Sequence, residues 1–224
     1  MTGRMAGTPC VAALGALTVM LGACSQAEPA QDETVAEQAI DDADAADGEL
    51  LNPEDFARSM IGPRILGPQG PTVQSRFEGP DGTTGTIESY VACPIETSGS
   101  ACNPAELPET TIFTYVMRVT PDERASAFRT AVPVFGYAGV AGFEKGEAQA
   151  ALGGDARLEL RCVNGGLFYS VVGGEGWRAG APITFFWQGT LPPAGPAQAY
   201  QLIAGGRIGT AEGPAPAQQT TGGC

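Results

Sequence analysis

The nine residues Thr111-Ile-Phe-Thr-Tyr-Val-Met-Arg-Val119 carry the clearest structural signal in this chain. Their side chains alternate between two sets, Ile112, Thr114, Val116 and Arg118 on one side and Phe113, Tyr115, Met117 and Val119 on the other. A period of two residues is typical of a β-strand, whose successive side chains point to opposite faces of the sheet. Because one set is apolar and the other is mixed, the stretch predicts a strand with one face on a core.

The same alternation recurs on both sides of this strand, in Val73–Glu78, Ile87–Ala92, Leu158–Cys162 and Ile183–Gln188. Asn164-Gly165-Gly166 is typical of a tight hairpin turn between two strands. The chain also holds 32 glycines and 18 prolines, which favours many short strands joined by turns. We therefore expect an all-β fold, an antiparallel β-sandwich with one or two short helices. Its alternation resembles that of exported immunoglobulin-like modules.

The predicted boundaries place this sandwich domain at residues 72–209. Residues 52–71 predict a short helix, begun by Asn52-Pro53 and stopped by Gly62-Pro63, and then a linker. Residues 121–128 and 144–152 are further candidates for short helices. After Gly209 the sequence is rich in Pro, Ala, Gln and Gly, so residues 210–224 are expected to form a flexible C-terminal tail.

The first residues of the chain predict export. Arg4 is followed by an apolar run from Val11 to Met20, which is too short to span a membrane but fits the core of a signal peptide. The run ends in Leu21-Gly22-Ala23-Cys24, which resembles the lipobox of bacterial lipoproteins. The resemblance implies that residues 1–23 are a signal peptide and that Cys24 is acylated. An ordinary secretory signal that contains a cysteine is the alternative.

The lipoprotein resemblance also implies a location in the bacterial cell envelope, where the protein would be held to a membrane by its acyl chains. Ser25, in place of an Asp after the cysteine, favours the outer membrane by analogy with enterobacterial sorting. Residues 24–51 are acidic and rich in Ala, with no Lys, Arg or aromatic residue, so they are expected to form a disordered tether.

The remaining cysteines predict a disulfide framework, because an exported protein meets an oxidising compartment. If Cys10 leaves with the leader and Cys24 takes the lipid, four cysteines remain, which allow three pairings. We expect Cys93–Cys102, which closes a short loop, and Cys162–Cys224, which fixes the C-terminus. A metal–thiolate cluster is the alternative, but the four have no C-x-x-C spacing.

Composition excludes several classes of function. The chain has no histidine, which removes the usual Ser-His-Asp and Cys-His catalytic arrangements and histidine-ligated metal sites. Its formal net charge is −13 and Lys145 is the only lysine, which argues against binding to a polyanion such as nucleic acid. The sequence therefore predicts no catalytic residues, no metal and no cofactor.

Three groups of residues are candidate sites. Trp177 and Arg178 follow a glycine-rich loop and could hold a sugar ring or a carboxylate, or Trp177 could instead close one end of the core. Glu88, Glu159 and Glu175 could form a carboxylate pair if the fold brought them together. The Asp81–Gly85 loop could offer oxygen ligands to calcium, but a plain turn is the simpler interpretation.

These observations favour a non-catalytic binding module of the cell envelope, whose partner or glycan ligand the sequence does not identify. The alternative is a carboxylate-dependent hydrolase that acts on cell-wall or extracellular glycan.

Overall fold

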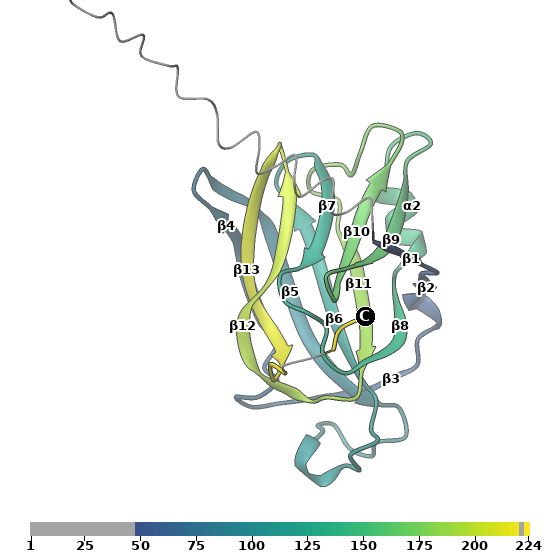
Figure 1. Cartoon of the computed structure of the whole chain (residues 1–224), viewed down its shortest axis with the longest axis vertical. Coiled ribbons are helices and arrows are strands. Elements are labelled where there is room, and N and C mark those ends of the chain that lie inside the picture. Colours follow the sequence, from purple (N-terminus) through teal and green to yellow (C-terminus); the bar gives the residue numbers. More distant parts are fainter. Residues whose placement is uncertain (1–47, 220–221) are drawn as a thin grey trace, which may run out of the picture.

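The computed structural model describes residues 48–219 and 222–224 (Figure 1). The predicted signal peptide, Cys24 and most of the tether lie outside these residues. The helical elements are α2 (Lys145–Ala151) and the short 3-10 helices η1 (Phe56–Arg58) and η2 (Pro104–Glu106). The strands are β1 (Glu49–Leu51), β2 (Glu54–Asp55), β3 (Ile61–Arg64), β4 (Val73–Gly79), β5 (Gly82–Pro94), β6 (Phe113–Pro121), β7 (Ala125–Thr130), β8 (Tyr137–Phe143), β9 (Arg157–Val163), β10 (Gly166–Val172), β11 (Ile183–Gly189), β12 (Pro193–Ala204) and β13 (Arg207–Pro216).

All thirteen strands belong to one sheet, in the order β1-β9-β10-β7-β12-β13-β4-β5-β6-β11-β8-β2, and β3 pairs with β5 beside this path. Neighbouring strands are antiparallel except β2 and β8, which are parallel. The predicted β class is therefore confirmed. The immunoglobulin-like arrangement of two antiparallel sheets is not, because the strands form a single mixed sheet that curls on itself (Figure 1).

The segment Glu49–Asp55 joins the two edges of this sheet. Its first part, β1, pairs with β9, and its second part, β2, pairs with β8 at the opposite end of the strand order. The backbones approach closely here, since a Cβ atom on Gly142 would clash with the carbonyl oxygen of Glu54. One short segment thus covers part of both hydrogen-bonding edges, which would otherwise be exposed there.

Aromatic side chains show how tightly the sheet is curled. Phe128 of β7 lies with its ring centroid 4.7 Å from that of Phe185 on β11, although the two strands are far apart in the order of the sheet. The rings of Tyr169 and Tyr200 also lie within about 6 Å of Phe128. The curled sheet therefore buries its inner face against itself, and the core runs continuously from β10 to β11.

The stretch that begins at Thr111 forms the centre of this arrangement as β6, between β5 and β11. Val119 lies opposite Ile87 on one side and Ile183 on the other, and all three are buried. On the other face of the strand Arg118 is exposed. The predicted strand is confirmed, but its alternation of buried and exposed residues holds only from Met117 to Thr120, since Thr114 and Val116 on the face of Arg118 are also buried. The hairpin turn at Asn164-Gly165 is confirmed, and both residues have positive φ angles, of 50° and 78°.

Three tyrosines are buried in the core with their hydroxyl groups paired. Tyr115, Tyr169 and Tyr200 donate hydrogen bonds to the carbonyl oxygens of Leu191, Phe186 and Pro214, at 3.0, 3.1 and 2.8 Å respectively. Burial raises the pKa of all three phenols, because the core disfavours the charged phenolate. The core therefore contains polar atoms whose hydrogen bonds help to fix its register.

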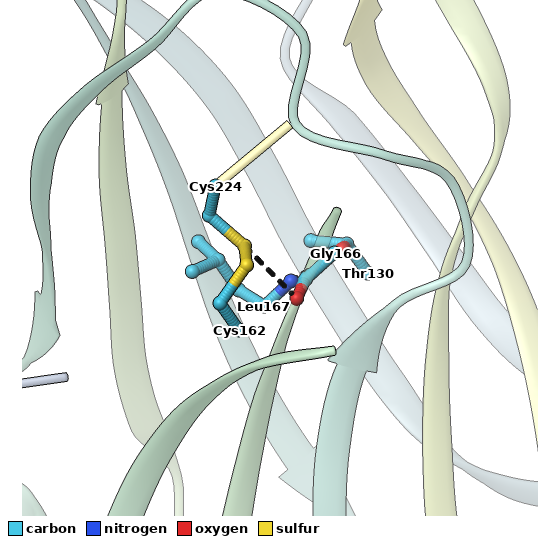
Figure 2. Close-up of a disulfide and its surroundings, with 5 residues drawn as sticks. All are labelled: Thr130, Cys162, Gly166, Leu167 and Cys224. Carbon is cyan, nitrogen blue, oxygen red and sulfur yellow. Dashed lines mark hydrogen bonds between the residues drawn. A yellow bond between two sulfur atoms is a disulfide. The ribbon is translucent and has the colours of Figure 1, made fainter. Parts of the chain in front are cut away.

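Both predicted disulfides are present. Cys93–Cys102 closes a loop beneath the end of β5 and is buried, and Cys162–Cys224 ties the C-terminus to β9. Figure 2 shows the second bridge, where the Sγ atom of Cys224 lies 3.2 Å from the carbonyl oxygen of Gly166. Beside it the amide of Leu167 donates to the Oγ1 atom of Thr130 at 3.0 Å. This end of the β9–β10 hairpin is thus held by covalent and hydrogen bonds together.

Several predicted boundaries are wrong. The predicted tail from residue 210 continues as β13 to Pro216, because small inward residues such as Gly213 lie directly against the ring of Tyr200. Residues 121–128 do not form a helix, since Ala125–Thr130 is β7 and pairs with β10 and β12. Pairing along the sheet outweighs the weak local helix signal.

The region predicted as a short helix and linker, residues 52–71, contains β2, η1 and β3 instead. Asp55, rather than Asn52, caps the one short helical turn, since its carboxylate accepts from the amide of Ala57. The helix predicted in 144–152 is confirmed as α2, with Glu144 as its N-cap. The last residues of the predicted tether, Glu49–Leu51, form β1.

Candidate binding site

The two residues singled out in the glycine-rich loop hold the fold together. Trp177 is completely buried, and its indole Nε1 donates to the carbonyl oxygen of Ala181 at 2.6 Å. Its backbone also exchanges hydrogen bonds with Ala125 at the start of β7. Trp177 therefore occupies the position of a core lid, and its ring offers no exposed face on which a ligand could stack.

Arg178 turns away from the loop toward the C-terminus of α2. Its guanidinium donates to the backbone carbonyl oxygens of Ala150 and Ala151. These carbonyls belong to the last turn of the helix, which has no further amide to pair with them, so a cation is favourable there. Arg178 caps a helix in this structure, and the hypothesis that it binds a ligand gains no support from its geometry.

The loop itself does border an open hollow of about 440 Å³, together with the β12–β13 turn. Half of the lining residues are glycines, namely Gly173, Gly174, Gly176, Gly205 and Gly206. Its charged side chains, Arg124 and Glu175, pair with each other at 3.8 Å. Because these two charges already neutralise each other, the hollow has little with which to recognise a ligand.

The three candidate carboxylates are not brought together. Glu88 lies on β5 and pairs with Arg64, Glu159 lies on β9 and pairs with Arg157 and Arg161, and Glu175 pairs with Arg124. Each therefore contacts a different set of arginines. A hydrolase that needs two carboxylates on opposite sides of one bond finds no such pair among these three residues.

In the part of the chain that the structure describes, no group of three or more His, Cys, Asp or Glu residues is placed to hold a metal ion. Pro80 and Asp81 form the turn between β4 and β5. The backbone carbonyl of Asp81 accepts a hydrogen bond from Arg207, which fixes this turn to β13.

A polar hollow of about 450 Å³ lies on the outer face of three adjacent strands. Two rows of side chains cross these strands in register, and we call the six residues the β4–β6 grid. The first row is Gln74, Glu88 and Arg118, and the second row is Arg76, Thr86 and Thr120. Directly opposed side chains in antiparallel strands have Cβ atoms about 4.5–5.5 Å apart, so all six can contact one small ligand.

The charges of the grid are held in place by residues outside it. Arg118 forms an ion pair with Glu147 of α2 and donates to the Oγ1 atom of Thr184 at 3.2 Å. Glu147 is fixed in turn, because its Oε2 atom accepts from the amide of Thr184 at 2.7 Å. The orientation of Arg118 therefore depends on how α2 packs against β11.

A second arginine from outside the grid fixes Glu88. The Nη1 atom of Arg64 lies 3.6 Å from a carboxylate oxygen of Glu88, and its guanidinium stacks 3.6 Å above the ring centroid of Tyr90. Arg76, by contrast, is exposed, and its guanidinium has no partner among residues 48–219 and 222–224. The grid thus contains ordered charges and one cation that is available to a ligand.

A third hollow, of about 270 Å³, lies beside the C-terminal disulfide and is lined by Arg129, Phe168 and Gln201. Its polar groups largely satisfy one another. Gln201 accepts from Arg129 at 2.7 Å and donates to Thr210 at 3.3 Å, and the hydroxyl of Thr130 is used by Leu167. The β4–β6 grid keeps more unused donors and acceptors and is therefore the better candidate site.

Sequence reasoning did not single out this grid. The alternation of β4, β5 and β6 marks each of its residues as outward-facing, but alternation alone does not show which residues of different strands become neighbours. Which residues become neighbours is decided by the register between the paired strands, and this register depends on the whole sheet.

Comparison with known proteins gives no match, since no family model fits the chain and neither a curated protein nor a solved structure resembles it significantly. In the described part of the chain, no helix is long and apolar enough to cross a membrane.

Proposed function

We propose that this protein is an exported, lipid-anchored module of the bacterial cell envelope that binds an envelope component through its outer sheet surface. The observation that carries the proposal is the sequence Leu21-Gly22-Ala23-Cys24 at the end of a short apolar run. Acyl chains on Cys24 would hold the domain at a membrane. One chain gives marginal binding, and two or more give stable anchoring.

The disulfides support the same compartment. Four cysteines of the folded domain form two bridges, which are stable in oxidising compartments and rare in the cytosol. The surface of the domain supports a role in binding, because a polar hollow of about 450 Å³ falls within the usual range for ligand sites.

The anchor is tested with Cys24→Ser in the full chain. We expect the variant to lose label from radioactive fatty acid and to leave the membrane fraction, while the wild-type chain keeps both. Ser25→Ala is a matched control that should change neither. A Cys24→Ser chain that still takes label and pellets with membranes would overturn the anchor.

The binding role is tested by photo-cross-linking in cells. A photoreactive amino acid at Gln74, on the rim of the grid, should give a specific adduct, whereas the same residue at Arg157, exposed on β9, should not. Equal adducts from both positions, or none from Gln74, would contradict a binding role for this surface.

A further inference from the structure

The shape of the β4–β6 grid follows from the sizes of its side chains. Thr86 and Thr120 are short and lie next to each other in the second row, while Gln74, Arg76, Glu88 and Arg118 are long and surround them. The threonines therefore form a floor and the long side chains form walls. A hollow of about 450 Å³ with polar walls has room for one or two sugar rings.

The chemistry of the walls selects a ligand rich in hydroxyl groups. The carboxylate of Glu88 only accepts hydrogen bonds, the guanidinium groups of Arg76 and Arg118 only donate, and the amide of Gln74 and the threonine hydroxyls do both. Ile87 also borders the hollow, but it is only 2% exposed, so it offers almost no apolar surface to a ligand. A ligand held here must be recognised by hydrogen bonds and charge.

The charge of the site selects an acidic ligand. Arg64, Arg76 and Arg118 gather on this surface, where Arg64 pairs with Glu88 and Arg118 pairs with Glu147. Arg76 is the cation without a partner in the described part of the chain. A planar carboxylate can accept two parallel hydrogen bonds from such a guanidinium.

We propose, on the basis of the function proposed above, that the β4–β6 grid binds an acidic oligosaccharide. A sugar carboxylate pairs with Arg76, and the ring hydroxyls bond to Glu88, Thr86 and Thr120. Three arginines are too few for nucleic acid, whose affinity depends on many phosphate contacts. A peptide cannot extend the sheet here, because β4, β5 and β6 each have strand neighbours on both sides.

Calorimetric titration of the detergent-solubilised full chain tests the proposal. Tetragalacturonic acid should bind, with an affinity that falls as salt is added. Maltotetraose, which has no carboxylate, should bind at least tenfold more weakly. Inorganic phosphate alone should also bind at least tenfold more weakly, since it lacks the ring hydroxyls.

Variants locate the site. Arg76→Gln should weaken the binding of tetragalacturonic acid at least tenfold, whereas Arg157→Gln, at another exposed arginine, which lies on β9, should change the affinity less than twofold. Thermal unfolding of both variants confirms that each is folded. Unchanged affinity in Arg76→Gln, equal binding of the neutral sugar, or phosphate binding as tight as the tetrasaccharide would overturn the inference.

The two proposals fail in distinguishable ways. If no tetrasaccharide binds but Gln74 still gives a specific cross-link to a protein, the acidic-oligosaccharide inference is wrong and the binding module remains. If Gln74 gives no adduct in cells, the binding role of this surface is itself contradicted.

Discussion

The inner and outer faces of the curled sheet are built from alternate residues of the same strands, yet they differ in almost every physical property. Ile87 is fully buried among apolar side chains, while its neighbour Glu88 has a side chain 38% exposed and faces arginines. The inner face is continuous and aromatic. The outer face above β4–β6 is polar and hollow. If the outer face binds a ligand as proposed, stability and recognition are separated by one residue step along a strand, and substitutions can address them independently.

Among the changes considered, alkaline pH should destabilise the packed inner face of the sheet most. Burial raises the pKa of Tyr115, Tyr169 and Tyr200 in the folded state, so the folded protein keeps three protons that the unfolded chain releases above its ordinary pKa of about 10. The contribution of these three tyrosines to stability is fully present below about pH 10 and is lost as the pH rises through their pKa values in the folded state. Each tyrosine contributes about 1.4 kcal/mol of loss per pH unit in that window.

Phenolate absorbance and circular dichroism measured together check this expectation. The three phenols should ionise only as the fold is lost, and Tyr200→Phe should make the loss of stability with pH less steep. With only one lysine in the chain, few other groups titrate in this range. Ionisation of all five tyrosines in a folded protein would show that the inner face is more accessible than its burial indicates.

Removing the lid of the core should have the next largest effect. Trp177→Ala deletes a fully buried indole and its hydrogen bond to Ala181, and such changes cost about 3–5 kcal/mol. Arg157→Ala on the outer face should stay within about 0.5 kcal/mol of the parent chain. Denaturant unfolding measures both. If Trp177→Ala leaves the unfolding midpoint unchanged, Trp177 is not a structural lid.

A single buried hydroxyl offers a finer comparison between the two faces. Thr130→Val removes the acceptor of the Leu167 amide beside the C-terminal disulfide, and leaving a buried donor unpaired costs about 1–3 kcal/mol. The same exchange at Thr120, on the floor of the grid, should change stability by less than about 0.5 kcal/mol. Equal losses at the two threonines would remove the distinction between the faces.

Parts of the fold could be predicted from sequence because they depend on local patterns. Alternation predicted the strands at Thr111–Val119 and Leu158–Cys162. Asn164-Gly165 predicted the turn that joins β9 to β10. The disulfide pairings followed from spacing and the expected compartment. A short helix within residues 144–152 was also predicted, and it forms as α2.

Other parts depend on contacts between distant segments. The pairing of Glu49–Asp55 with both sheet edges and the continuation of β13 to Pro216 have no strong local pattern, because the segments are short or lack large apolar residues. The candidate site also depends on contacts between segments that are distant in the sequence. Its six residues come from three strands, and only the register makes Gln74, Glu88 and Arg118 neighbours.

The smallest effect on stability is expected for the ion pair between Arg64 and Glu88 at the edge of the grid. This pair is the sharpest test of the difference between the inner and outer faces of the sheet. Arg64 and Glu88 lie 3.6 Å apart with side chains 45% and 38% exposed, so solvent screens their attraction. A double-mutant cycle of Arg64→Gln and Glu88→Gln should give a coupling energy of about 0.2–1 kcal/mol. The stacking of Arg64 on Tyr90 adds a comparably small amount at an exposed site.

The same two variants should nevertheless weaken tetragalacturonic acid, because Glu88 loses the charge that accepts from ring hydroxyls and Arg64 no longer orients it. A pair that contributes little to folding but much to affinity is what a recognition surface requires, since its geometry is kept for a ligand. A coupling energy above about 2 kcal/mol would place the pair with the structural contacts of the fold. The outer face would then be a stabilising surface in its own right, and the separation of the two faces would fail at the point where the ligand is expected to bind.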